Sequence, residues 1–299
     1  MNLLDELQSR ILCGDGAIGT LLLEGGVPFE RCLEEINVTE PERIHAIHQQ
    51  YIAAGARVIK TNTFGANAVR LERFGFENRV AEINCAAAQI TSAAARGKNV
   101  FVAGSVGPLG INSDEANARG INQEDCFREQ ILGLLEGGVQ IIFFETFTDY
   151  AEMEIAVKTK KEITDSLAIC SFACAPEGRI SSAMPLVDAI AKLRELGVEM
   201  VGANCTNGPN EMMHLLQRLP ADYILAAYPN AGYPQYHEGR FIYHMGPDYF
   251  AQSARGMVAE GAHLIGGCCG TTPAHVAAIS SAVAELQPMR TNFLRYNNR

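Results

Sequence analysis

The chain has 299 residues, of which 47% are hydrophobic and 19% charged, a composition typical of a globular protein with a sizeable core. Its net charge of −10 makes nucleic acid and anionic membranes poor partners, and no apolar run approaches the ~20 residues of a membrane-spanning helix. The acidic N-terminus lacks the basic and apolar regions of a signal peptide. Nine cysteines in such a chain predict free thiols in a reducing cytoplasm, rather than a disulfide framework.

Eight apolar runs of strand length occur along the chain. They cover residues 11–13, 56–62, 100–104, 139–145, 167–173, 200–204, 223–228 and 262–265. Near-continuous apolar runs are typical of parallel strands that are buried on both faces of a sheet. The runs therefore predict a parallel sheet covered by helices.

Segments with helical periodicity separate these runs. Helices are expected over residues 41–51, with Thr39 as the cap candidate, and over 124–136, 150–163, 185–196 and 273–286. Several of them end at glycine, which readily adopts the left-handed conformation found at helix C-termini. The repeated order of helix, glycine and strand predicts an α/β fold, a (β/α)8 or TIM barrel over residues 1–288, with its active site at the C-terminal ends of the strands. Residues 289–299 are expected to be a polar tail or the start of a linker.

The first strand leads into a glycine-rich loop, Gly14-Asp15-Gly16-Ala17-Ile18-Gly19, that matches the dinucleotide-binding pattern G-x-G-x-x-G. A Rossmann unit would place its next strand within ~30 residues, whereas the next apolar run begins near Ala56. An acidic residue in the loop would also repel pyrophosphate. We therefore expect the loop to present Asp15 and backbone N–H groups at the mouth of a barrel.

Three cysteines follow two of the expected strands. Cys205 comes after residues 200–204, and the adjacent pair Cys268 and Cys269 comes after residues 262–265, among three glycines. Packing explains such a pair poorly, because neighbouring strand residues point in opposite directions, whereas a glycine-rich loop can turn both sulfurs towards one point. Three thiolates would bind zinc and leave one tetrahedral position open, as in catalytic zinc sites.

Three other interpretations of these cysteines stay open. They are unrelated buried cysteines, a non-catalytic barrel with a structural zinc, or a redox dithiol formed by Cys268 and Cys269. A structural zinc needs a fourth protein ligand, and no further cysteine or histidine follows an expected strand. The remaining six cysteines are expected to be structural, with Cys13, Cys170 and Cys174 in strands and Cys32, Cys85 and Cys126 in loops or helices.

Two carboxylates also follow expected strands. Asp15 and Glu145 together could hold an ammonium group, because two carboxylates pair well with one cation. Glu145 can equally be interpreted as a cap for the following helix, and Asn230, in Pro229-Asn230-Ala231-Gly232, as a turn residue.

Six short segments, most of them at the ends of expected strands, together resemble one known family. They are 14–20 (GDGAIGT), 61–66 (TNTFGA), 144–147 (FETF), 202–205 (GANC), 229–232 (PNAG) and 266–273 (GGCCGTTP). They resemble the zinc-dependent homocysteine S-methyltransferases, and the similarity runs from about residue 10 to about residue 287. TNTF and PNAG are most similar to the homocysteine domain of cobalamin-dependent methionine synthase, and to the domain fused to methylenetetrahydrofolate reductase in some bifunctional bacterial proteins. Ala203 departs from the family pattern, in which Ile or Val is commoner.

The resemblance implies a set of site residues. Cys205, Cys268 and Cys269 would hold Zn²⁺, and Asp15 and Glu145 would bind the homocysteine amino group. The backbone around Gly16 and Ala17 would bind the homocysteine carboxylate. Asn230 would lie beside the zinc and fill its open position when substrate is absent.

The implied reaction is methyl transfer to the homocysteine thiol, which gives methionine. A zinc-bound thiolate would be the nucleophile, because metal coordination deprotonates the thiol, and no catalytic residue beyond the zinc centre is expected. The methyl donor cannot be read from the residues: it is a methylcobalamin domain, fused or docked, or S-methylmethionine, or S-adenosylmethionine. A different thiol or a selenol as acceptor stays an alternative.

Overall fold

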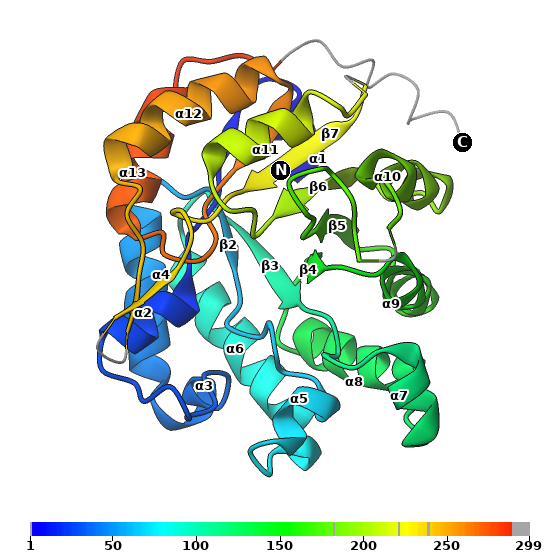
Figure 1. Cartoon of the computed structure of the whole chain (residues 1–299). Helices are drawn as coiled ribbons and strands as arrows, with labels where there is room; N and C mark the ends of the chain where they lie inside the picture. The colour runs from blue at the N-terminus through cyan, green and yellow to red at the C-terminus, as the bar shows by residue number, and fades with distance from the viewer. Residues whose placement is uncertain (1, 182, 221, 238–239, 289–299) are drawn as a thin grey trace.

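The structure is a computed structural model that describes residues 2–181, 183–220, 222–237 and 240–288. The expected tail, residues 289–299, lies outside the described residues. Eight parallel strands form a nearly closed barrel with helices between them around its outside (Figure 1). Within the described residues, no helix combines the length and apolar character needed to cross a membrane.

Every expected strand is present. The barrel strands are β1 (Leu12–Cys13), β2 (Val58–Lys60), β3 (Phe101–Val106), β4 (Ile141–Phe147), β5 (Leu167–Phe172), β6 (Met200–Asn204), β7 (Ile224–Tyr228) and β10 (Ala262–Ile265). They pair in the order β1-β10-β7-β6-β5-β4-β3-β2, and a parallel bridge between Gly14 and Val58 joins the two ends. The predicted (β/α)8 barrel is therefore confirmed. Cys174, expected in a strand, instead follows the end of β5.

The five expected helices are also present, with small differences at their ends. They are α4 (Pro41–Ala53), α8 (Gln123–Glu136), α9 (Tyr150–Ile163), α10 (Leu186–Glu195) and α13 (Pro273–Val283). The cap expected at Thr39 is wrong, because α4 begins directly at Pro41 and Glu40 occupies its N-cap position. Pro185 is the N-cap residue of α10, not part of its first turn. Left-handed glycines follow the helices as expected, for example Gly55 after α4.

Several elements were not anticipated. The helices among them are α1 (Leu3–Leu7), α2 (Ile18–Glu24), α3 (Ile36–Thr39), α5 (Ala68–Glu72), α6 (Val80–Ala95), α7 (Ser113–Ala118), α11 (Pro209–Leu216) and α12 (Pro247–Ala259). A short 3-10 helix covers Glu77–Arg79. An antiparallel hairpin, β8 (Gln235–His237) and β9 (Arg240–Ile242), lies between β7 and α12 and so belongs to the C-terminal face of the barrel.

The barrel interior is filled by apolar side chains rather than open. Phe143 and Tyr228 are fully buried there, with their rings edge to face and 5.3 Å between centroids. Gly266 allows this packing, because a Cβ at that position would lie 2.2 Å from the Tyr228 ring. These aromatic rings close the barrel beneath the C-terminal ends of the strands.

Candidate active site

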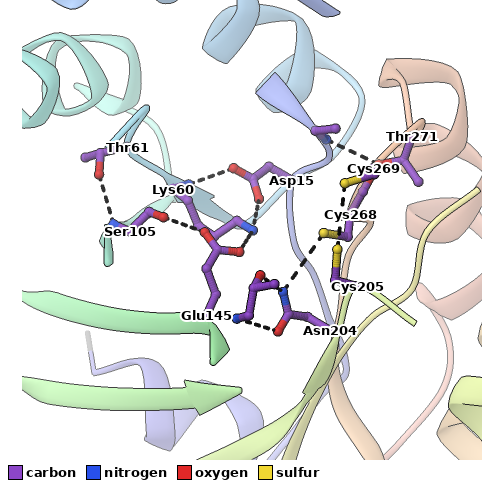
Figure 2. A network of polar contacts seen from close by, with 12 residues as sticks. Asp15, Lys60, Thr61, Ser105, Glu145, Asn204, Cys205, Cys268, Cys269 and Thr271 are labelled. Carbon is purple, nitrogen blue, oxygen red and sulfur yellow. Dashed lines mark hydrogen bonds and ion pairs between the residues drawn. The ribbon is translucent and has the colours of Figure 1, made fainter. Parts of the chain in front are cut away.

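The three predicted cysteines meet at the C-terminal end of the barrel (Figure 2). Cys205 follows β6, and Cys268 and Cys269 follow β10. All three Sγ atoms lie within 4.8 Å of one another, and those of Cys205 and Cys269 are 3.7 Å apart. Tetrahedral zinc with Zn–S bonds of about 2.3 Å requires sulfurs about 3.8 Å apart. The trio is therefore spaced to share one metal ion.

No other group of this kind is present in the part of the chain that the structure describes. Among the His, Cys, Asp and Glu side chains of the described residues, Cys205, Cys268 and Cys269 are the one set of three or more whose ligand atoms lie this close together. All nine cysteines are free thiols, and the six expected to be structural stand apart from the trio. Three protein ligands leave one tetrahedral position for a further ligand.

The charge state of the trio also depends on a cation. Hydrogen bonds from Cys205 and Cys268 lower the pKa of the Cys269 thiol to about 3. The hydrogen bond with Cys268, that with Cys269, and burial all raise the pKa of Cys205. A divalent cation bound between them would allow all three sulfurs to be thiolates at once.

Backbone strain turns Cys205 towards its partners. Its φ is 56°, in the left-handed region that residues other than glycine rarely adopt. The N–H of Cys205 donates to the carbonyl of Tyr228 at 3.0 Å, which holds this conformation. Strain of this kind persists where the surrounding structure enforces it, commonly at functional sites.

The loop after β7 holds the two adjacent cysteines. The N–H of Cys268 donates to the Pro229 carbonyl at 2.8 Å, and the N–H of Cys269 donates to Oδ1 of Asn230 at 3.0 Å. The Thr271 hydroxyl donates to the Cys268 carbonyl at 2.7 Å. Asn230 therefore does more than form a turn, because its side chain fixes the backbone of Cys269.

Asn204, which belongs to the GANC segment but is assigned no role from the sequence, joins the ends of β4 and β6. Its Oδ1 accepts from the N–H of Thr146 at 2.8 Å, and its Nδ2 donates to Oγ1 of Thr146 at 2.6 Å. Thr146 is itself left-handed, with φ 62°. Asn204 Nδ2 also lies 4.0 Å from the Cys268 sulfur. The pair of hydrogen bonds thus locks two strand ends beside the sulfur trio.

The two predicted carboxylates lie close together, and a lysine lies with them (Figure 2). Lys60, at the end of β2, places Nζ 2.7 Å from Oε2 of Glu145 and 4.0 Å from Oδ1 of Asp15. The Lys60 backbone N–H donates to Oδ2 of Asp15 at 2.7 Å, and the Ser105 hydroxyl donates to Oε1 of Glu145. The alternative that Glu145 caps the next helix is wrong, because Asp149 caps α9.

Burial and charge act against each other in this cluster. Burial raises the pKa of Asp15 to about 7, although the Lys60 charge opposes the shift. Burial lowers the pKa of Lys60, but the charges of Glu145 and Asp15 outweigh it and raise that pKa overall. Lys60 is therefore a charged ammonium at neutral pH.

A cavity of about 280 Å³ connects the sulfur trio to this cluster. Of the predicted site residues, its lining contains Gly16, Ala17, Glu145, Cys205, Cys268 and Cys269, together with Lys60. Asp15 and Asn230 are buried behind the lining. The N–H of Ala17 donates to Oγ1 of Thr271 at 3.2 Å, so one of the two backbone groups expected to bind a carboxylate already has a partner.

Comparison with known proteins identifies the family. A sequence model described as homocysteine S-methyltransferase matches residues 12–283, nearly the whole chain. The chain belongs to the homocysteine S-methyltransferase family. The family resemblance drawn from the residue motifs is thereby confirmed.

Two kinds of relative resemble this homocysteine S-methyltransferase family member. Methionine synthase of Mycobacterium tuberculosis is 32% identical over 96% of the chain, and that of Mycobacterium leprae is 31% identical over 95%. The chain spans only about a quarter of their lengths, 26% and 25%. Crystal structures of the homocysteine methyltransferase MmuM from Escherichia coli match over nearly their full length. The metallated form has a TM-score of 0.76 at 26% identity, and the match covers 93% of this chain and 98% of MmuM. The oxidized form has a TM-score of 0.74 at 27% identity, and the match covers 93% of this chain and 97% of MmuM.

Proposed function

We propose that this family member transfers a methyl group to the thiol of homocysteine, forming methionine, with zinc bound by Cys205, Cys268 and Cys269. The observation that carries the proposal is the spacing of the three sulfurs, which fits a shared zinc ion. Family membership supports homocysteine as the acceptor. The similarity to metallated MmuM supports a metal at this site.

Zinc bound there would supply Lewis acidity that keeps an acceptor thiol deprotonated at neutral pH. The chain's own residues orient that chemistry. Asn204 and Asn230 fix the backbone on either side of the trio, which would hold the three sulfurs in place before substrate arrives. The aromatic floor of Phe143 and Tyr228 closes the barrel below the site and excludes water from that side. No general base is required at the sulfur.

The amino-acid end of homocysteine is proposed to lie towards Lys60 and Glu145, at the other end of the same cavity. Gly16 and Ala17 remain the predicted binding residues for its carboxylate, and Asp15 and Glu145 those for its amino group. Support comes from the cavity itself, which holds Gly16, Ala17 and Glu145 in one lining with the three cysteines. Asp15 lies directly behind that lining, next to Lys60.

For the methyl donor, the exposed surface favours delivery by another protein domain. Tyr236 of β8 is 71% exposed and contacts Phe241 of β9, and Phe241 in turn contacts Phe29, which is 67% exposed. All three lie in segments that follow barrel strands, on the face where the cavity opens. Exposed aromatic side chains in one cluster are typical of protein contact sites. A methylcobalamin domain, fused or docked, is thus the first candidate, ahead of S-methylmethionine and S-adenosylmethionine.

The test is methionine formation from homocysteine by the zinc-loaded protein, with each of these three donors supplied in turn. Metal analysis before and after thiol alkylation accompanies it. Turnover with at least one donor, lost on alkylation together with one equivalent of zinc, is the expected result. Zinc retained after alkylation of the three cysteines would indicate a structural ion elsewhere, and reversible oxidation of Cys268 and Cys269 without zinc would indicate a redox dithiol.

A further inference from the structure

Lys60 is a buried ammonium in the position where the substrate's ammonium is expected. Its side chain is 8% exposed, and its Nζ lies between the two carboxylates, 2.7 Å from Glu145 and 4.0 Å from Asp15. The rings of Tyr228 and Phe143 lie 4.6 Å and 5.2 Å from the same Nζ, an arrangement that also favours a cation. The carboxylate pair is thus supplied with a cation by the chain itself.

The existing hydrogen bonds of Asp15 and Glu145 leave few carboxylate oxygens free to accept from a second ammonium. Oε1 of Glu145 accepts from Ser105 and Oε2 accepts from Lys60. Oδ2 of Asp15 accepts from the Lys60 backbone N–H. Oδ1 of Asp15 has no hydrogen-bond partner, but it is buried, and the cavity is lined by Lys60 rather than by Asp15.

We propose that Lys60 is a specificity-determining residue that shares the Asp15–Glu145 pair with the acceptor and so weakens recognition of the acceptor's amino group. The inference rests on the proposed methyl transfer to homocysteine. With the positive charge of Lys60 included, an incoming ammonium meets at most one net negative charge from this cluster rather than two. The pocket therefore selects its acceptor mainly by the thiol and the carboxylate, and it accepts thiols of the same length that lack the amino group.

Two acceptors isolate this effect. L-Homocysteine and 4-sulfanylbutanoate have the same chain, thiol and carboxylate, and differ only in the amino group. The ratio of their dissociation constants from the zinc-loaded protein, measured by titration calorimetry, reports the contribution of the amino group alone. The same ratio of kcat/KM values, measured with whichever donor supports turnover, provides a second readout.

Lys60→Met removes the resident cation but keeps the backbone N–H that positions Asp15. We expect this substitution to raise the preference for homocysteine over 4-sulfanylbutanoate about tenfold or more. Lys60→Arg keeps the charge and should leave the preference within about threefold of the wild type. Lys160→Met, at a buried lysine of α9 outside the cavity lining, is the matched control and should not change the ratio.

Zinc content and thermal unfolding of each variant show whether it is folded and loaded. Lys60→Gln, which retains a donor for Glu145, replaces Lys60→Met if the latter does not fold. An unchanged or smaller preference in the neutral variants, with thiol binding intact, overturns the role of Lys60 and leaves the methyl transfer standing. Failure of the zinc-loaded wild type to bind either thiol overturns both.

Discussion

Asn204 offers the sharpest test of how the fold positions the sulfur trio. Asn204→Ala removes both hydrogen bonds to Thr146 and leaves the Thr146 N–H without its acceptor in a strained conformation. A lost neutral hydrogen bond costs about 1 kcal/mol, and a poorly solvated donor left unpaired costs about 1–2 kcal/mol more. The expected loss of unfolding free energy is therefore about 2–3 kcal/mol.

This loss can be converted to a thermal shift. An unfolding entropy of about 2.1 cal/mol/K per residue gives about 0.6 kcal/mol/K for 299 residues. The unfolding midpoint should fall by about 3–5 °C, measured by calorimetry. Because Asn204 also lies beside the Cys268 sulfur, zinc affinity should fall about 10–100-fold, as is typical for residues that orient metal ligands. Competition with a chromogenic chelator measures this affinity.

Asn84→Ala is the matched control for the same substitution. Asn84 is fully buried in α6 and donates two hydrogen bonds, to the Ala66 and Val80 carbonyls at 2.7 and 2.8 Å. Its loss should lower the midpoint by a similar amount and leave zinc affinity unchanged. If Asn204→Ala lowers the midpoint but keeps zinc affinity within about twofold of the wild type, the positioning argument is refuted.

Three further predictions concern metal, pH and donor. Cys268→Ala should abolish zinc binding and methionine formation together, and normal turnover by a demonstrably zinc-free variant would contradict the proposed function. The Asp15 pKa rises from 3.8 to about 7 on folding, so the folded state holds this proton more tightly than the unfolded chain does. The stabilisation from this proton is complete below about pH 4 and is lost as the pH rises through 7. Between these pH values the free energy of unfolding, measured by chemical denaturation, should fall more steeply in the wild type than in Asp15→Asn. Parallel pH dependences of the two proteins would disprove the prediction. Tyr236→Ser combined with Phe241→Ser should slow transfer from a protein-borne donor severalfold without affecting a small donor, and equal effects on both in steady-state assays would exclude a docking role.

The elements that the sequence predicts well are those fixed by local pattern. Each barrel strand is a run of apolar residues between polar segments, so its burial on both faces is visible without knowledge of its neighbours. Once the barrel is assumed, the rule that strand C-terminal ends meet at one face brings Cys205 to Cys268 and Cys269, although 63 positions separate the segments. The alanine-rich helix α6 was not anticipated.

The residues that were missed act through partners on other strands. Lys60 ends β2 as one polar residue after an apolar run, and nothing beside it in the sequence shows that Glu145 of β4 lies 2.7 Å from its ammonium. Asn204 precedes Cys205, yet its side chain is fixed by hydrogen bonds to Thr146, 58 positions earlier in the chain. A lysine within an apolar strand run, at the barrel face where two carboxylates are also expected, is the one sequence signal that could have indicated the contact between Lys60 and Glu145.

Charge balance explains why a lysine belongs in such a pocket. Three thiolates with one divalent ion carry about one negative charge, and Asp15 and Glu145 add two more when both are ionised. The proposed acceptor, homocysteine, would bring a thiolate and a carboxylate into this pocket, so each unbalanced negative charge would oppose its binding. Lys60 offsets one of those charges, because its ammonium lies beside the two carboxylates. A neutral residue at position 60 would leave the carboxylate pair without this cation, and the pocket would then depend more strongly on the substrate's own ammonium to balance the pair.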